Sequence, residues 1–218
     1  MFSTKNNDTA VWMNVSDLFA VLFLVFLLLS LLFVTASMET LEQLEKVEAE
    51  QQVVEAEIRK QLKAELQQEL NYWQAEFIDS TLSIRFYSGG DKILFQQGAD
   101  ELEPHFQDVL RSFFPSYLMV LENDSISRYI HDIRIEGYTS SEGDYLSNMF
   151  LSQRRSNSVL QFLLQEVALS TYQYDWLLGL VSSNGLGSKH PIYLNDGLED
   201  LDKSRRVEIK LVLKNTSP

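Results

Sequence analysis

The chain has 218 residues, of which 45% are hydrophobic and 22% are charged, and its formal net charge is −13. This acidity argues against nucleic-acid binding, because a protein that binds a phosphate backbone needs a surface lined with Lys and Arg. The absence of cysteine excludes disulfides and thiolate metal sites, and the scattered histidines lack metal-ligand spacing. The sequence also lacks a nucleophile elbow and a phosphate-binding loop. We therefore expect no catalytic residue, no metal, no cofactor and no enzyme activity.

The first predicted element is a transmembrane helix over residues 12–36. Between Val15 and Val34 only two serines and Asp17 are not apolar, and about 20 residues are enough to cross a hydrocarbon core of roughly 30 Å. A cleaved signal peptide fits less well, because the apolar run exceeds the roughly 7–15 residues that are usual for a signal peptide. We expect an uncleaved, single-pass anchor.

The residues that flank this span predict its orientation. Lys5 and the amino terminus precede the span, whereas glutamates follow it before the next lysine, Lys46. The positive-inside rule therefore places a short leader, residues 1–11, in the cytoplasm and everything after about residue 36 outside. In a bacterial inner membrane, the outside is the periplasm.

A long helical tether is predicted over residues 37–78. This segment lacks Gly and Pro and is rich in strong helix formers. Its apolar residues recur at mostly three- and four-residue steps from Val47 to Phe77, which favours a straight or slightly right-handed pairing of helices. We expect a parallel pair, and hence a homodimer, because a polar helix with one apolar stripe needs a partner. The alternative is a solitary amphipathic helix that lies on its own domain.

Strands and helices interleave after the tether, over residues 79–214. This predicts an α+β domain in which helices pack on a sheet, followed by a short tail at 215–218. The patterns predict strands at 80–87, 131–138 and 205–213, a further strand within 176–183, and helices at 96–118 and 145–167.

Five segments of this domain resemble the motifs of OmpA-like peptidoglycan-binding domains, in the same order. They are "ILFQQGADELEP", "IRIEGYTSSEG", "LSQRRSNSVLQFL", "GLGSKHPI" and "SRRVEI". Each motif alone is weak, but five in register over about residues 80 to 213 are a specific signal. The resemblance implies an α/β sandwich that binds the peptide stem of peptidoglycan.

The membrane segment resembles that of MotB-type stator subunits, which have a Trp, an Asp five residues later and then an apolar run. Here these residues are Trp12, Asp17 and "FLVFLLLS". The short leader and the long acidic tether are most similar to the ZorB family of Zorya anti-phage systems. This resemblance implies an ion-driven motor with a MotA-like membrane partner, driven by H⁺ or Na⁺. A flagellar-type stator subunit and a passive structural anchor between inner membrane and cell wall are the alternatives.

The resemblance also implies a wall-binding site. In OmpA-like domains an Arg holds the carboxylate of diaminopimelate in the peptide stem, and an Asp holds its ammonium. The Arg corresponds to Arg155, whose guanidinium suits a carboxylate better than Lys would. Thr139, Asn148 and Leu151 correspond to further motif positions, and the last two share one helix face with Arg155.

The Asp of this motif is replaced by Ser140. A hydroxyl can accept a hydrogen bond but cannot neutralise an ammonium. Glu142 or Asp144 can substitute if the loop bends toward the ligand. The alternative is a domain that has kept the fold and lost the ligand, with Arg155 as an ordinary surface charge.

Asp17 is the candidate ion-translocating residue. A charge in a membrane helix is costly, and the short Asp side chain cannot reach headgroup water as Lys or Arg can. The alternative is that Asp17 caps the first helical turn, although Ser16 or Asn14 would fill that role at a lower desolvation cost. A carboxylate among partner helices can instead take up an ion on one side and release it on the other. The sequence does not distinguish H⁺ from Na⁺.

Overall fold

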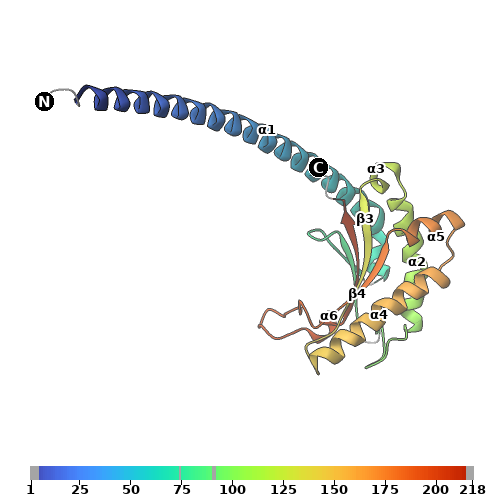
Figure 1. Cartoon of the computed structure of the whole chain (residues 1–218). Coiled ribbons are helices and arrows are strands. Elements are labelled where there is room, and N and C mark those ends of the chain that lie inside the picture. The colour runs from blue at the N-terminus through green and yellow to red at the C-terminus, as the bar shows by residue number, and fades with distance from the viewer. Residues whose placement is uncertain (1–4, 74, 90–91, 215–218) are drawn as a thin grey trace. The chain divides into compact units, whose positions relative to one another are not determined.

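The structure is a computed structural model that describes residues 5–73, 75–89 and 92–214 (Figure 1). The predicted tail at 215–218 and the first four residues of the leader lie outside these ranges. The chain divides into two units, one that extends to Gln52 and one that begins at Val53 and contains the sheet. A single helix, α1 (Lys5–Trp73), contributes residues to both units.

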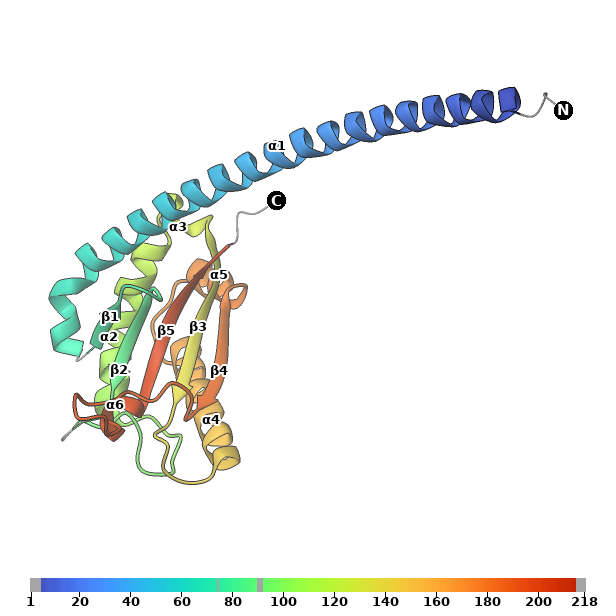
Figure 2. The same ribbon diagram turned by 90° about the vertical axis from the view of Figure 1, so that its left-hand side faces the viewer.

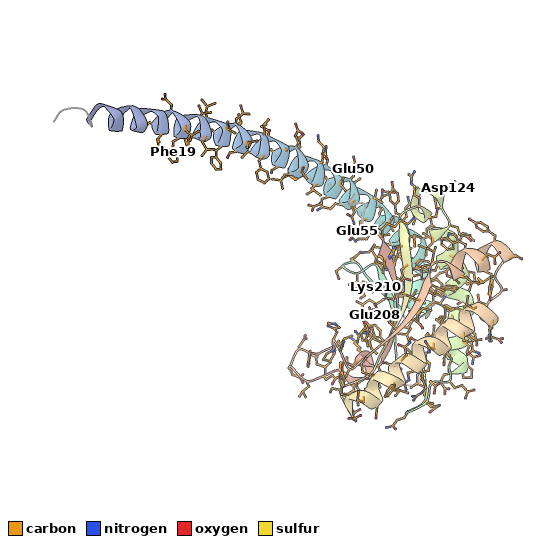
Figure 3. All side chains as sticks on the ribbon, viewed as in Figure 1. Phe19, Glu50, Glu55, Asp124, Glu208 and Lys210 are labelled. Atoms are coloured by element: carbon orange, nitrogen blue, oxygen red, sulfur yellow. The ribbon has the colours of Figure 1, made fainter. Side chains whose placement is uncertain are left out.

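The first part of α1 is apolar on all sides. Within the described residues, α1 is the one helix that is long and apolar enough to cross a membrane, and its most apolar window has a mean hydropathy of 3.0 with none of it buried. Leu18 and Phe33 are 68% and 74% exposed, and Phe19 projects from the helix (Figure 3). A helix that is hydrophobic all round suits a lipid environment.

The last turns of α1 bury an apolar stripe in the domain that follows. The stripe consists of five residues that are almost fully buried: Ile58, Leu62, Leu66, Leu70 and Trp73. The Trp73 ring meets Phe113 edge-on with ring centroids 5.1 Å apart, and its Nε1 donates to Ser112 Oγ at 2.9 Å. For this stretch, the preference for a parallel pair is corrected, because the domain itself covers the stripe. Pairing of the residues between 37 and 52 stays a prediction.

The compact unit that contains the sheet begins at Val53, earlier than the predicted domain boundary at residue 79. Helix α1 ends at Trp73, and residues 75–78 of the predicted tether form strand β1 (Ala75–Ile78) at one edge of the sheet. Lys63 forms an ion pair with Asp79 at 2.9 Å, and Arg59 Nε donates to the Asp79 carbonyl oxygen at 3.0 Å. These contacts tie α1 to the turn after β1.

The sheet has five described strands in the order β1-β2-β5-β3-β4 (Figure 2). Strands β2 (Ser83–Tyr87), β5 (Arg206–Leu213) and β3 (Ile130–Tyr138) pair antiparallel, and β3 pairs parallel with β4 (Val181–Gly187). A parallel pair needs a crossover connection. Helices α4 (Tyr145–Gln165) and α5 (Thr171–Leu178) lie within that connection.

Two predicted elements have different bounds in the structure. The helix expected from residue 96 begins only at Pro104 and continues as α2 (Pro104–Leu121), because proline suits the first turn of a helix. The strand expected within 176–183 is divided between the end of α5 and the start of β4. Two short helices, α3 (Asp124–Ser127) and α6 (Leu201–Ser204), complete the described elements.

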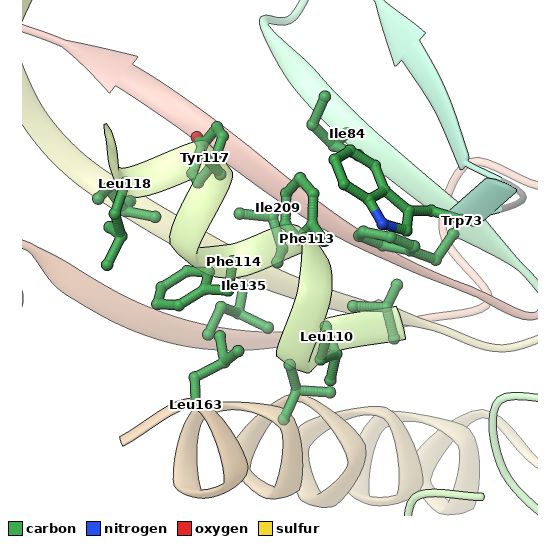
Figure 4. Close-up of a cluster of buried hydrophobic side chains, with 14 of the residues drawn as sticks. Trp73, Ile84, Leu110, Phe113, Phe114, Tyr117, Leu118, Ile135, Leu163 and Ile209 are labelled. Carbon is green, nitrogen blue, oxygen red and sulfur yellow. The ribbon is translucent and has the colours of Figure 1, made fainter. Parts of the chain in front are cut away.

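The hydrophobic core lies between the sheet and the helices. Figure 4 shows Phe113 and Phe114 of α2 beside Ile135 and Ile209 of the sheet, with Leu163 of α4 pointing toward them. Because side chains alternate along a strand, the neighbours of these core residues point to the other face. That face carries a buried ionic cluster: Glu208 Oε1 accepts from Arg206 Nε at 2.6 Å and from Arg85 Nε at 2.8 Å.

Candidate functional site

A pocket of about 620 Å³ lies where β3 ends and β5 begins. Strands β3 and β5 are antiparallel, with Gly137 opposite Val207, so the loop after β3 and the residue before β5 meet at one edge of the sheet. The first turns of α4 form another wall. Six of the seven wall-site residues predicted in this domain line the pocket: Thr139, Ser140, Glu142, Asn148, Leu151 and Arg155.

Arg155 is a buried cation in this pocket. It is 6% exposed, its Nε donates to the Ala99 carbonyl at 2.9 Å, and its Nη2 donates to the Gln96 carbonyl at 3.0 Å. Its guanidinium carbon lies 4.9 Å from the centre of the Phe95 ring. Within the described residues it has no carboxylate within 4.0 Å. Burial, followed by repulsion from Arg205, lowers the pKa of Arg155 to about 10, so the side chain stays charged at neutral pH.

The loop between β3 and α4 is held by two side chains. Asn148 Nδ2 donates to the carbonyl of Glu142 at 2.9 Å and to that of Ser140 at 3.4 Å. Glu199 accepts from the backbone N–H of Ser141 at 3.1 Å and from its hydroxyl. Burial opposes ionisation of Glu199, but hydrogen bonds from Ser141 and Ser204 keep its pKa below the ordinary value. Asn148 therefore positions the loop that forms one wall of the pocket.

Asp144, one of the two suggested substitutes for the missing Asp, has another role in the structure. It is the N-cap of α4, and its Oδ2 accepts from the backbone N–H of Ser147 at 2.9 Å and from the Ser147 hydroxyl at 3.1 Å. These hydrogen bonds lower the pKa of Asp144. It is not among the residues that line the pocket. A cap of this kind stabilises the helix N-terminus, so Glu142 is the suggested substitute that faces the pocket.

Sequence reasoning missed two charged residues of the pocket, Arg205 and Asp202. Arg205 Nη2 lies 2.7 Å from Asp202 Oδ1, and its Nη1 lies 3.7 Å from Glu142 Oε2. The available signal was the pair of arginines at the start of the last strand. Because side chains alternate there, Arg206 joins the ionic cluster on the sheet while Arg205 lines the pocket.

The remaining predicted residue, Asp17, belongs to the other unit. It is exposed on α1, next to apolar residues that are also exposed. The structure thus gathers the predicted wall-site residues other than Asp144 in one pocket and leaves Asp17 apart from them in the sequence and in the division into units.

Comparison with known proteins gives matches over most of the chain. The OmpA family model matches residues 94–205. The chain is 35% identical to the Zorya protein ZorB of Escherichia coli strain Crooks, over 95% of this chain and 90% of that protein. It is 27% identical to the Zorya protein ZorB of Escherichia coli O139:H28, over 92% of this chain and 79% of that protein. The crystal structure of the periplasmic domain of Helicobacter pylori MotB matches with 23% identity and a TM-score of 0.45, over 64% of this chain and 78% of that chain.

Proposed function

Because the chain belongs to the ZorB family of MotB-like proteins with an OmpA domain, we propose that it anchors an ion-driven motor of the bacterial inner membrane to peptidoglycan. Among the described residues, one helix near the amino terminus is long and apolar enough to cross a membrane, which fits a single-pass membrane protein. The OmpA match includes every pocket residue that the sequence motifs assign to wall binding. In this proposal the amino terminus is cytoplasmic and the sheet-containing unit is periplasmic.

The observation that carries the wall-binding part is the buried guanidinium of Arg155, which donates to two backbone carbonyls but has no carboxylate within 4.0 Å among the described residues. A buried charge without a counter-charge is unfavourable, and a ligand carboxylate would supply that counter-charge. Arg155 lines a pocket large enough for part of a peptide stem. A carboxylate bound there would make charge-assisted hydrogen bonds, which are stronger than neutral ones.

Sedimentation with purified peptidoglycan sacculi tests this part. Full-length Arg155→Ala protein in detergent should remain in the supernatant where the wild type sediments. Arg154→Ala is the matched control, because Arg154 directly precedes Arg155 on α4, pairs with Asp100 at 3.5 Å and is about half exposed. Arg155 also holds two backbone carbonyls, so Arg155→Lys and a thermal unfolding curve check that the loop and the fold persist. Undiminished sedimentation of Arg155→Ala would remove Arg155 from the site.

We further propose that Asp17 carries the translocated ion. Its support is the position of a carboxylate among exposed apolar side chains of a span that can cross a membrane, because such residues usually face a partner or an ion path rather than lipid. The proposed partners are a MotA-like membrane subunit, a second copy of this chain, and H⁺ or Na⁺. A passive anchor has no use for this carboxylate.

The proposed cellular role is anti-phage defence of the Zorya type, which rests on the family relationship. The rival is a flagellar-type stator. The neighbouring genes discriminate between them: a MotA-like gene beside helicase or nuclease genes supports defence, and flagellar genes support the rival.

A further inference from the structure

The charges that line the pocket are paired unequally. Within the described residues the lining contains two guanidinium groups, Arg155 and Arg205, and two carboxylates, Glu142 and Asp202. Arg155 has no carboxylate within 4.0 Å, whereas Arg205 has both. A pocket with equal numbers of cations and anions, one of its cations unpaired, suits a ligand that carries a carboxylate and an ammonium close together.

Glu142 has a backbone held by hydrogen bonds and a side chain that is largely exposed and weakly paired. Its carbonyl accepts from Asn148, and the adjacent Ser141 is held by Glu199. Its carboxylate is 63% exposed and has Arg205 as its ion-pair partner, at 3.7 Å. Ser140 Oγ lies 3.5 Å from Glu142 Oε2, so this carboxylate lies beside the position where the motif has its Asp.

Arg205 can release Glu142 without losing its other partner. Its contact with Asp202 is 2.7 Å long, which is a full hydrogen-bond distance. Its contact with Glu142 is 3.7 Å long and partly exposed, and ion pairs of this kind are weak. Thr139 adds a second unsatisfied group, because its hydroxyl is buried, lines the same pocket and has no hydrogen-bond partner among the described residues.

We infer that Glu142 replaces the missing Asp as the acceptor of the ligand's ammonium, and that Arg205 exchanges partners as the ligand enters. This inference rests on the proposed wall-binding function. In the empty pocket, Arg205 neutralises both Glu142 and Asp202. When the stem binds, its ammonium displaces Arg205 from Glu142, Arg205 stays with Asp202, and the ligand's carboxylate meets Arg155. No covalent bond changes.

The test compares native sacculi with sacculi whose free amino groups have been acetylated with acetic anhydride. Acetylation removes the ammonium but leaves the carboxylates. Full-length wild-type protein in detergent should bind acetylated sacculi about tenfold more weakly or worse, because it loses a hydrogen bond between charged groups. Glu142→Gln should bind native sacculi as weakly as the wild type binds acetylated ones, with no further loss on acetylation. A wild type that does not discriminate, or a Glu142→Gln variant that still does, would overturn the inference.

Two further variants complete the design. Asp196→Asn is the matched control: it removes one carboxylate from the loop before α6, outside the pocket lining, and its side-chain oxygen can still accept from the Leu198 N–H. Asp196→Asn should bind native sacculi more tightly than acetylated sacculi, by the same factor as the wild type. Arg205→Gln removes the cation that competes with the ligand for Glu142. It should therefore increase the ratio of the affinity for native sacculi to the affinity for acetylated sacculi. An unchanged or smaller ratio would contradict the exchange of partners.

The Arg155→Ala variant separates this inference from the proposed function. If Arg155→Ala binds both kinds of sacculi normally, the wall site itself is misassigned. If Arg155→Ala binds neither and Glu142→Gln still discriminates, the wall site holds and only the role of Glu142 fails. Unfolding curves of all variants, measured without sacculi, show whether a loss of binding reflects a loss of fold.

Discussion

The two parts of α1 present apolar side chains in opposite ways. In the first part, large apolar residues such as Leu18, Phe23 and Phe33 are exposed on all sides of the helix. In the last turns, the apolar residues form one stripe that is buried in the domain, with Leu62 only 1% exposed. The same secondary structure therefore serves two environments, and the distribution of apolar residues around the helix distinguishes them.

This difference indicates that the two parts of α1 need different surroundings. A helix surface that is apolar all round requires a nonpolar solvent or partner helices, whereas a stripe is satisfied by one packed neighbour. Residues between Val53 and Trp73 are thus part of the folded unit rather than of a free tether. A pull on this part of α1 would act directly on the core that it packs against. The first part holds Asp17 among exposed apolar side chains, which is the basis of the proposal that it carries an ion.

The largest expected effect comes from removing the carboxylate of the membrane part. Asp17→Asn should preserve membrane insertion, dimerisation and assembly with the MotA-like partner but abolish the cellular function, because amide and carboxylate have the same shape and only the carboxylate can bind and release an ion. Asp17→Glu should keep part of the function, with the ionisable group displaced. The measurement is phage plating on cells that carry the complete system, with co-purification of the partner as the assembly check.

Ser30→Ala is the matched control for this prediction, because it removes another polar group from the same apolar run without removing a charge. It should protect cells as the wild type does. Full protection by Asp17→Asn would end the motor proposal and leave the passive anchor.

A smaller effect is expected from the buried stripe. Leu62→Ala should lower the free energy of unfolding by about 2–5 kcal/mol, because it removes a buried side chain and leaves a cavity. Val53→Ala, at a position on the same helix that is 69% exposed, should change it by less than about 0.5 kcal/mol. Chemical denaturation followed by tryptophan fluorescence measures both, since Trp73 lies in the affected core. Equal effects of the two variants would contradict the burial of Leu62 in the domain. An effect of Leu62→Ala that depends on protein concentration would indicate that the stripe packs on a second copy instead.

The comparison also shows what the sequence could predict about the fold. The uninterrupted apolar run predicted the membrane span, and the period of the stripe predicted a helix with one buried face. The period does not say which surface covers that face, and here the domain covers Ile58 to Trp73 where a second helix was expected. Boundaries were also hard to predict: the polar run before Pro104 has helix-forming residues but lies outside α2. The residues of β1 follow the helix without a glycine or proline to separate them.

The pocket lined by Thr139 and Arg155 was predictable where motif and topology agree. The motif order brought Thr139 and Arg155 into the same site, and the structure gathers them. Motifs carry no information about the direction of a loop side chain, so Glu142 and Asp144 were equivalent until the structure placed Asp144 at the N-cap of α4. Asp202 and Arg205 were missed because their contribution depends on the long connection between β4 and β5, which returns to the pocket through α6.

The smallest effect concerns the polar face of the sheet, where Glu208 is buried between two arginines. Burial alone would raise the pKa of Glu208, but hydrogen bonds and attraction from Arg206 and Arg85 lower it below its ordinary value of 4.5. A carboxyl whose pKa is lower in the folded state stabilises the fold at pH values above the unfolded pKa. That contribution is lost as the pH falls from about 4.5 toward the folded pKa. The domain should therefore lose stability on acidification through this range.

Glu208→Gln isolates this contribution. The variant should be less stable than the wild type at pH 7, because it leaves Arg206 and Arg85 without their shared carboxylate. This gap, the difference in free energy of unfolding between wild type and variant, should narrow as the pH falls below about 4.5. Denaturation curves at pH 7, 5, 4 and 3 measure the gap. Glu48→Gln is the control, because it removes one exposed acid from the part of α1 that lies outside the compact unit and should leave the curves of the domain unchanged. A gap that stays constant from pH 7 to pH 3 would mean that packing, and not the charge of Glu208, holds this face of the sheet.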